Sequence, residues 1–453
     1  MANSLKADVV VIGAGSTGLA AALSAARNGV DCLLVERYGF LGGTATIVHT
    51  WAGFQTRHGE QVVGGIGNDI VNKLVELNGS TGHIPKSIPE SVTLVDPEVF
   101  KYVAQKMCIE SGVRVLLHSF FVESYAPDGT ISSITVYNKS GRQDIHARFY
   151  IDCTGDGDVA AKSGCIYEVG RRSDGKCQPL SMTCRVAGFD RKRFVDYMRD
   201  HPEEMAKADT WTRGLDIGSI DGSNEVFTSF KGLNQLVARI EHEYAYVFPR
   251  ERVNFALTPI EGIVYINSTR VTGVDATDAE GLTTAELSGR EQVMDIVKFL
   301  TRFVPGFESA YLLDTSIQIG VRETRRIIGD YVIERDDVLD GTRFDDVIAQ
   351  GIYPLDIHDV DGRGMEHRNV SRPYQVPYRS LIPKGLENIF VGGRCVSSTH
   401  EALGALRVIP NCMAMGQAAG TAAALAYRQH TTSVRNVNVV DLQGVLRDQG
   451  AIF

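Results

Sequence analysis

The sequence lacks the residue groupings that mark several common protein classes. Its eight cysteines are scattered, with no C-x-x-C pair and no Cys/His cluster at zinc spacing, so no metal site is expected. No run of Lys and Arg exceeds three residues, and 46 basic against 55 acidic residues leave a formal net charge of −9. Because phosphate neutralisation needs a basic surface, nucleic acid is not expected as a partner. We interpret the cysteines as free thiols in a reducing compartment.

Long apolar segments are also missing. The chain begins with a short polar stretch that leads directly into an apolar run at 9–12, which is too short for the core of a signal peptide. The longest stretch of low polarity, 414–427, contains Gln417 and two glycines. It falls short of the roughly 18 residues that a membrane span needs. These observations predict a cytoplasmic protein without membrane contacts.

The chain has enough apolar residues for two or three domains, because 43% of its 453 residues are hydrophobic. Segment 8–36 predicts a strand, a glycine-rich turn, a helix and a second strand. Its unbroken apolar runs are typical of parallel strands that are covered on both faces. Between 113 and 151, alternating apolar and polar residues with turn signals predict a small antiparallel meander.

The rhythm of strands and glycine turns is lost in the middle of the chain and returns near its end. Residues 388–391 predict another buried strand, and a helix follows from Ala414. We therefore expect an α/β domain that begins in 1–170 and is completed by 385–453, with a separate substrate domain at 171–384.

A row of small residues marks the helix predicted after Ala414. Such a face allows a neighbour to approach the backbone closely. Taken alone, the pattern favours packing against a strand over contact with a bulky ligand. The residues fall at i, i+3, i+4, i+7 and i+8 and are Gly416, Ala419, Gly420, Ala423 and Ala424.

The strongest single motif is a G-x-G-x-x-G formed by Gly13, Gly15 and Gly18, between the first predicted strand and helix. In such motifs the first glycine permits a tight turn, the second leaves room for a pyrophosphate, and the third allows close packing of helix on strand. Glu36 ends the second predicted strand, where a carboxylate accepts hydrogen bonds from an adenosine ribose. The motif predicts a dinucleotide with its phosphates at the helix amino terminus.

Further glycine turns distinguish FAD from NAD. A glycine pair, Gly42-Gly43, follows soon after Glu36. Glycine-rich turns also follow two later predicted strands, at 152–158 and 392–394. Three separated glycine turns around one sheet fit a long, extended dinucleotide, and they therefore favour FAD.

These segments resemble a known family. Segments 152–158 (DCTGDGD), 320–327 (GVRETRRI) and 393–407 (GRCVSSTHEALGALR) are similar to those of FAD-dependent oxidoreductases in the glutathione-reductase-like, two-dinucleotide-motif superfamily. The similarity is strongest to a bacterial branch with DATGDGD-like, GxRESRRI-like and GRCxSxxHEALGxxR-like motifs. It implies a Rossmann-like FAD-binding domain with a parallel sheet and a β-meander, plus a mixed α+β substrate domain.

The resemblance also implies how FAD is held. The cofactor would be noncovalent, with its adenine against the backbone of Val122 and the helix after Arg407 directed at the flavin. Asp156 either anchors the ribityl chain or caps its own turn. The full set of implied FAD contacts is Gly13, Gly15, Ser16, Thr17, Gly18, Glu36, Arg37, Gly42, Gly43, Thr44, Val122, Thr154, Gly155, Asp156, Gly393, Arg394, Arg407 and Asn411.

Departures from relatives narrow the chemistry. Disulfide reductases place two cysteines shortly after the glycine pair, whereas 42–49 contains none. Aromatic hydroxylases have a G-D-A motif where this chain has Arg394, and the tryptophan pattern of flavin halogenases is absent because the chain holds only Trp51 and Trp211. Of the flavoenzyme reactions considered, these departures leave simple hydride transfer to or from the flavin.

Four residues are candidates for the reaction. His400 is the favoured proton-transfer group, with a structural hydrogen bond as the alternative. His49 is either near the flavin, with covalent attachment as a lesser alternative, or packed in the core. Arg322 shares a face with Arg326 if a strand forms there, and it either binds a carboxylate or carbonyl or joins a salt bridge. Tyr378 either covers the flavin ring or forms part of a rigid segment that leads into the last predicted strand.

The expected function is hydride exchange between flavin N5 and a small polar metabolite at a C–OH, C–N or C=C centre. The alternatives are a flavin monooxygenase and an FAD subunit that passes electrons to a partner protein. No second G-x-G-x-x-G follows a strand, so electrons are expected to leave to oxygen or a separate carrier. The sequence leaves the substrate, the acceptor and a homo-oligomeric state open.

Overall fold

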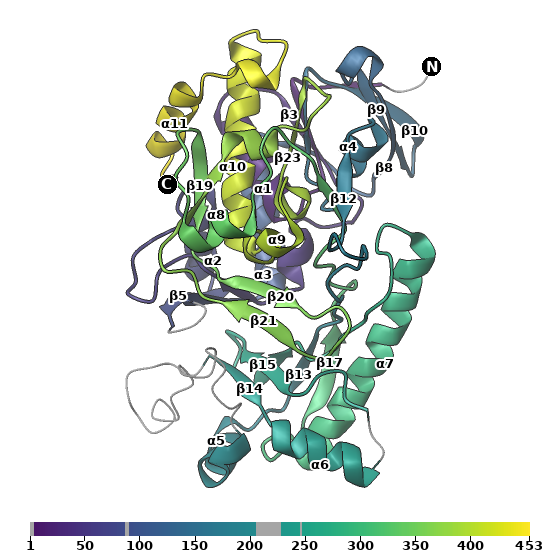
Figure 1. Ribbon diagram of the computed structural model, residues 1–453, viewed down its shortest axis with the longest axis vertical. Coiled ribbons are helices and arrows are strands. Elements are labelled where there is room, and N and C mark those ends of the chain that lie inside the picture. The colour runs from purple at the N-terminus through teal and green to yellow at the C-terminus, as the bar shows by residue number, and fades with distance from the viewer. Residues whose placement is uncertain (1–3, 87–89, 205–227, 245–246) are drawn as a thin grey trace.

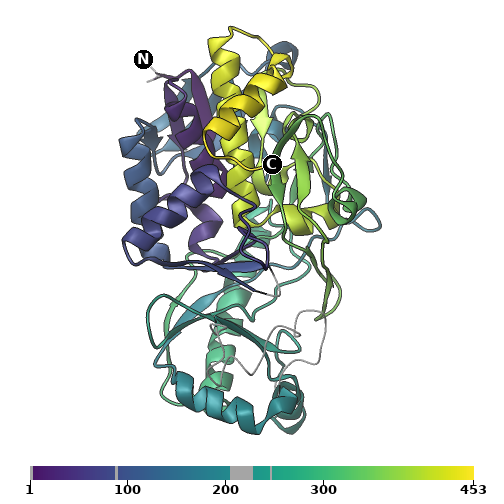
Figure 2. The same cartoon turned by 90° about the vertical axis from the view of Figure 1, so that its left-hand side faces the viewer.

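The computed structural model describes residues 4–86, 90–204, 228–244 and 247–453, and Trp211 lies outside these ranges. The chain forms two bodies that lie one above the other in Figures 1 and 2. Both ends of the chain lie in the upper body, and the lower body is built from the middle of the sequence (Figure 1).

A five-stranded parallel sheet forms the centre of the upper body, in the order β23-β11-β2-β3-β7. Its faces are covered differently. Val9 and Val11 pack into the helical core, whereas Val10 and Ile12 pack against the meander. Burial on both faces explains the unbroken apolar runs, and it confirms the predicted parallel sheet. The strands are β2 (Val9–Ile12), β3 (Cys32–Val35), β7 (Arg114–Leu116), β11 (Phe149–Asp152) and β23 (Ile389–Val391).

The antiparallel meander is shorter than the sequence pattern suggests. It consists of β8 (Phe120–Tyr125), β9 (Ser133–Asn138) and β10 (Gly141–His146), with β1 (Leu5–Lys6) added in parallel. The first and last strands of segment 113–151, β7 and β11, join the parallel sheet instead. Alternation along the chain does not reveal which sheet a strand will join, and this accounts for the difference.

Two long helices pack together across the middle of the upper body. They are α1 (Ser16–Arg27) and α10 (Ile409–Arg428), which lie side by side in both views (Figures 1 and 2). A Cβ on Gly416 would overlap the carbonyl of Thr17, and one on Gly420 would overlap the carbonyl of Ala21. Gly416 and Gly420 of this row therefore pack against a helix, whereas the sequence pattern favoured a strand as the neighbour.

The lower body is an antiparallel sheet in the order β14-β15-β16-β13-β17, packed against helices. Aromatic rings fill its core, where Phe194 packs edge-on against Phe230 and Phe255. This arrangement is mixed α+β. The elements are β13 (Cys184–Ala187), α5 (Arg191–Asp200), β14 (Ser229–Gly232), α6 (Asn234–Tyr244), β15 (Val253–Leu257), β16 (Ile263–Ile266), α7 (Ala279–Phe303) and β17 (Tyr311–Thr315).

The boundary predicted at residue 384 does not match the packing. The buried core of the lower body runs from Leu180 to Ile319, whereas Ile333, Ile348 and Val376 belong to the core of the upper body. The segment after 330 therefore returns to the first body earlier than predicted. It contains α8 (Arg335–Asp340), β19 (Val347–Gly351), β20 (Leu355–His358), β21 (Met365–Arg368) and β22 (Tyr374–Pro377).

No helix among the described residues is both long and apolar enough to cross a membrane.

The remaining elements of the described chain complete the upper body and its junction with the lower one. The elements are β4 (Thr50–Ala52), α2 (Gly65–Glu76), β5 (Ser80–Pro85), β6 (Ser91–Val95), α3 (Pro97–Glu110), α4 (Asp158–Lys162), β12 (Tyr167–Val169), β18 (Arg325–Ile327), α9 (His400–Leu406) and α11 (Val439–Asp448).

Candidate functional site

The glycine turn after β2 leaves an open space at the start of α1. Gly13 has φ +92°, and a Cβ there would press on the backbone of Cys153. A Cβ on Gly18 would overlap the carbonyl of Gly13, so this glycine lets the helix pack onto the turn. By contrast, a Cβ on Gly15 would meet nothing within 4 Å. The first turn of α1 therefore directs its unpaired N–H groups into open space, which is the arrangement that binds phosphate.

Glu36 closes the other side of this turn. Its Oε2 accepts a hydrogen bond from Ala14 N at 2.7 Å, and its Oε1 accepts one from Tyr38 N at 2.9 Å. Burial raises the pKa of this carboxyl above its usual value. An ionised carboxylate has about four acceptor sites, so two remain for a ribose.

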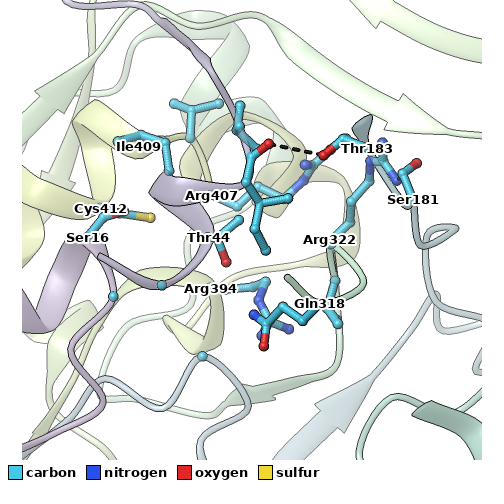
Figure 3. Close-up of a pocket in the computed structure, with 18 of the residues that line it drawn as sticks. Ser16, Thr44, Ser181, Thr183, Gln318, Arg322, Arg394, Arg407, Ile409 and Cys412 are labelled. Atoms are coloured by element: carbon cyan, nitrogen blue, oxygen red, sulfur yellow. Dashed lines mark hydrogen bonds between the residues drawn. The ribbon is translucent and has the colours of Figure 1, made fainter. Parts of the chain in front are cut away.

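A single cavity of about 370 Å³ begins at this turn and continues to the lower body. In Figure 3, Ser16 and Cys412 lie on one side of it, Thr44 and Arg394 lie further along, and Arg322 and Ser181 lie on the opposite side. The predicted FAD contacts that line it are Gly13, Gly15, Ser16, Thr17, Glu36, Arg37, Gly43, Thr44, Thr154, Gly155, Arg394 and Arg407.

Six predicted contacts do not line this cavity, and their packing explains why. Gly18 holds α1 against the turn, and Gly42, at φ +114°, packs against Phe100. Gly393 packs against the side chain of Thr17. Their glycine identity is required by close packing rather than by contact with a ligand.

The other three are Val122, Asn411 and Asp156. Val122 lies at an irregularity in the pairing of β8 and is 40% exposed, whereas Ser119, Phe120 and Phe121 line the cavity. Asn411 is buried and donates hydrogen bonds to Tyr374 Oη and Ala405 O.

Asp156 lies behind the cavity wall and acts through another side chain. Its Oδ1 is 2.9 Å from Arg394 Nη1, and it also accepts a hydrogen bond from Thr324 at 2.8 Å. Asp156 therefore fixes Arg394, which does line the cavity. The structure therefore places Arg394, and not Asp156, among the residues that line the cavity.

The residues present fit an extended dinucleotide. The space at Gly15 and the amino terminus of α1 suit a pyrophosphate, and Glu36 suits a ribose. Val408, Ile409 and Cys412 bring the amino terminus of α10 to the cavity. A helix dipole at that position stabilises negative charge on a neighbouring ring. The cavity therefore has a phosphate cradle at one end and a helix terminus further along.

The comparisons with known proteins agree with this geometry. The sequence model of the FAD-dependent oxidoreductase family matches residues 8–446. The chain belongs to this family. It is therefore an enzyme of the FAD-dependent oxidoreductase type, and FAD is its cofactor. A search of curated protein sequences gave no significant match.

Solved structures of flavin-dependent and related proteins align with most of this chain at low sequence identity. A geranylgeranyl bacteriochlorophyll reductase-like protein from Thermoplasma acidophilum aligns with a TM-score of 0.50 and 11% identity, over 99% of this chain and 85% of that one. The p-nitrophenol 4-monooxygenase of Pseudomonas putida aligns with a TM-score of 0.47 and 11% identity, over 98% and 86%. A myxobacterial chondrochloren halogenase aligns with a TM-score of 0.46 and 11% identity, over 98% and 79%.

Three of the four predicted reaction residues of this oxidoreductase do not line the cavity. His400 Nδ1 lies 2.8 Å from Glu323, so the histidine belongs to a buried ion-pair cluster. His49 is buried with its ring stacked on Tyr265 at 4.5 Å, and burial lowers its pKa to about 3. Tyr378 is buried and donates its hydroxyl to Val434 O at 2.6 Å, so it cannot roof the ring.

Arg322 is the predicted residue that does line the cavity. It lies outside β18, which begins at Arg325, so the predicted shared strand face with Arg326 is wrong. Arg326 is fully buried and paired with Glu323. Arg322 instead donates to Ser181 Oγ at 2.9 Å, at the end of the cavity nearest the lower body.

Sequence reasoning missed a pair of polar residues at this end. Asp356 and His358 alternate with Leu355 and Ile357 in β20, and both line the cavity. Figure 1 shows the hairpin of β20 and β21 at the junction of the two bodies. Two polar residues at i and i+2 of a strand share one face. That alternation was the available signal, but the four-residue strand was too short to stand out.

Proposed function

We propose that this oxidoreductase exchanges a hydride between noncovalently bound FAD and a small polar metabolite, at a C–OH, C–N or C=C centre. The observation that carries the proposal is the continuity of one cavity from the phosphate cradle at Gly15 to the polar residues of β20. When bound, FAD supplies the two-electron acceptor or donor. The chain supplies binding, orientation and proton transfer. His49, the candidate for covalent attachment, does not line the cavity, which favours noncovalent binding.

His358 is the proton-transfer group in this proposal. Burial and the neighbouring Arg322 guanidinium hold its pKa well below the usual value, so the ring is neutral and can accept a proton. Its Nε2 lies 3.5 Å from Asp356 Oδ2. Burial disfavours the charged form of Asp356, but a hydrogen bond from the neutral His358 ring and the adjacent Arg407 guanidinium keep the pKa of its carboxyl well below the usual range. A fixed carboxylate beside the imidazole orients the ring and stabilises it once it is protonated.

Ser181, Thr183 and Tyr265 complete the polar end of the cavity, and all three come from the lower body. Thr183 donates to Ile47 O at 3.2 Å, which joins the two bodies at this point (Figure 3). The lower body therefore lines the end of the cavity at which, in this proposal, a substrate meets the cofactor.

The test uses the purified chain loaded with FAD. A panel of metabolites is added without oxygen, and loss of the visible flavin absorption identifies a reductant. Turnover is then measured with an artificial electron acceptor. The proposal expects reduction by at least one hydroxy or amino compound and turnover by the isolated chain. It is overturned if flavin reduction requires NADH or NADPH and oxygen enters the substrate, or if turnover requires an added partner protein.

A further inference from the structure

Cationic side chains crowd the substrate end of the cavity. Lys231, Arg250, Arg322 and Arg407 all line it, and Asp356 is the only acidic residue among the described residues that line this end. Glu36 and Asp158 line the opposite, cofactor end.

Arg250 and Arg322 are held together by one hydroxyl. Ser181 Oγ accepts a hydrogen bond from Arg322 Nη1 at 2.9 Å and from Arg250 Nη2 at 3.3 Å. Arg322 Nη1 also donates to Pro179 O, and Arg250 Nε donates to Thr269 O at 3.2 Å. These bonds fix both guanidinium groups in position before any ligand arrives.

The bonds leave one edge of Arg322 available. Its Nε and Nη2 have no hydrogen-bond partner in the part of the chain that the structure describes. This pair of parallel donors matches the two oxygens of a carboxylate.

The positive charges of Arg250, Arg322 and Arg407 exceed the one negative charge that Asp356 supplies among the described residues at this end of the cavity. Burial and the neighbouring Arg250 and Arg407 hold the pKa of Arg322 well below its usual value. Glu323, the next residue in the chain, is engaged with Arg326 and His400 instead. Asp356 lies 3.7 Å from Arg407 and cannot neutralise the other two arginines as well. Like charges held together away from water are costly unless an anion joins them.

Asp356 also has an unused acceptor. The residue is 7% exposed, and its Oδ1 is buried without a hydrogen-bond partner. The same is true of His358 Nδ1. The end of the cavity therefore offers cationic donors on one side and acceptors on the other.

We propose that the substrate is a small carboxylic acid that bears a hydroxyl or amino group, with its carboxylate bound by Arg322 and Arg250 and the second group directed at Asp356 and His358. This inference rests on the proposed function, since it assigns the substrate class of the same site. It specifies the class by charge and donor pattern and leaves the carbon skeleton open.

The test measures binding separately from turnover. The FAD-loaded protein is titrated by calorimetry with lactate, glycerate, malate and serine, and with the corresponding amides, in which the carboxylate charge is removed. We expect at least one of these acids to bind saturably and its amide to bind at least about ten-fold more weakly, which is the loss typical of a charged hydrogen bond. Arg322→Gln should weaken acid binding by at least about ten-fold. Arg322→Lys should weaken it by less, because lysine keeps the positive charge but lacks the two parallel N–H donors of the guanidinium group.

Controls separate folding and cofactor effects from ligand binding. Arg193→Gln removes an arginine of the lower body that is paired with Glu308 on the surface, and it should leave acid binding unchanged. FAD loading and thermal unfolding are measured for every variant. If Arg322→Gln fails to fold, Arg322→Lys and the comparison of acids with amides still decide the question.

The outcomes distinguish this inference from the function on which it rests. If no acid binds, or if amides bind as tightly, the inference is overturned even when a neutral metabolite reduces the flavin. It is also overturned if Arg322→Gln shifts the flavin reduction potential but leaves acid binding unchanged, since the cations would then serve the flavin. If acids bind in this pattern but no compound reduces the flavin, the carboxylate site stands, whereas the substrate assignment fails together with the proposed function on which it rests.

Discussion

The imidazole Nε2 of His358 lies 3.5 Å from Asp356 Oδ2, with both residues on one face of β20 and both lining the cavity. The first prediction concerns this pair. Replacing His358 by Asn should slow substrate-dependent flavin reduction by about 100-fold or more, because a positioned base typically contributes that much. Stopped-flow absorbance measures the rate. His146→Asn, at an exposed position in β10, serves as the control and should react like the original protein.

The pH dependence provides a second check on His358. Because its pKa is held well below the usual 6.5, the neutral base persists below that pH. The rate of flavin reduction should therefore stay level as pH falls through 6.5 and decrease only at more acidic pH. A decrease centred near 6.5 would show that a different, solvent-exposed group moves the proton.

Two glycines of the first turn should respond in opposite ways to the same change. Gly15→Ala places a methyl group in open space, so the FAD-free protein should keep its stability while FAD affinity falls by about ten-fold or more. Gly18→Ala overlaps the carbonyl of Gly13, so it should reduce the free energy of unfolding by about 1–3 kcal/mol. Fluorescence titration with FAD and denaturant unfolding measure the two effects. Equal FAD affinity in Gly15→Ala would exclude the phosphate site.

Asp156 should influence FAD only through Arg394. Asp156→Asn removes a buried charge from the pair whose atoms lie 2.9 Å apart, so FAD affinity should fall by roughly ten-fold. Arg394→Gln should have a similar effect. The double variant should be little worse than either single variant, because both changes remove the same interaction. Additive losses would mean that Asp156 contacts the cofactor independently.

His49 should make the stability depend on pH. In the native protein burial lowers its pKa to about 3, whereas the unfolded chain has a value near 6.5. Above pH 6.5 both states are neutral and the contribution is fully present. As pH falls from 6.5 towards 3, only the unfolded state takes up the proton, and the free energy of unfolding drops by up to about 1.4 kcal/mol per pH unit.

His49→Phe keeps an aromatic ring beside Tyr265 and removes this proton. The pH slope of the unfolding free energy, measured with denaturant, should therefore become shallower by about one proton. His83 has a pKa lowered to about 4 by burial, and it remains in both proteins, so the difference isolates His49. An unchanged slope would contradict the buried, neutral state.

Tyr378 should matter for stability and not for the reaction. Tyr378→Phe removes the hydrogen bond to Val434 O, at a cost of about 1 kcal/mol in the free energy of unfolding. The rate of flavin reduction should not change. A clear loss of rate at unchanged stability would restore the prediction that this tyrosine covers the ring.

Local sequence signals were enough to group the residues at the cofactor end of the cavity. Gly13, Gly15 and Glu36 act through the backbone and side chains of one strand–helix–strand unit, so their spacing in sequence is close to their arrangement in space. The parallel sheet could also be predicted, because each unbroken apolar run is a local signal of a strand that is buried on both faces.

The substrate end could not be predicted in this way. Ser181, Arg250 and Asp356 come from segments far apart in the chain, and only tertiary packing brings them together. His400 was predicted as catalytic from its position between the last predicted strand and the helix that follows it, but its partner Glu323 is 77 residues away. Periodicity also gave no means of assigning residues 333–382 to the upper core instead of the lower one.

The contact of Gly416 and Gly420 with α1 has a consequence for how the chain is made. The partner of the first helix, α10, and the outer strand β23 emerge from the ribosome after the whole of the lower body. The core of the lower body spans Leu180 to Ile319. This body can therefore fold on the nascent chain before α10 has been synthesised and can pack against α1. A complete FAD site therefore requires that α10 has been synthesised.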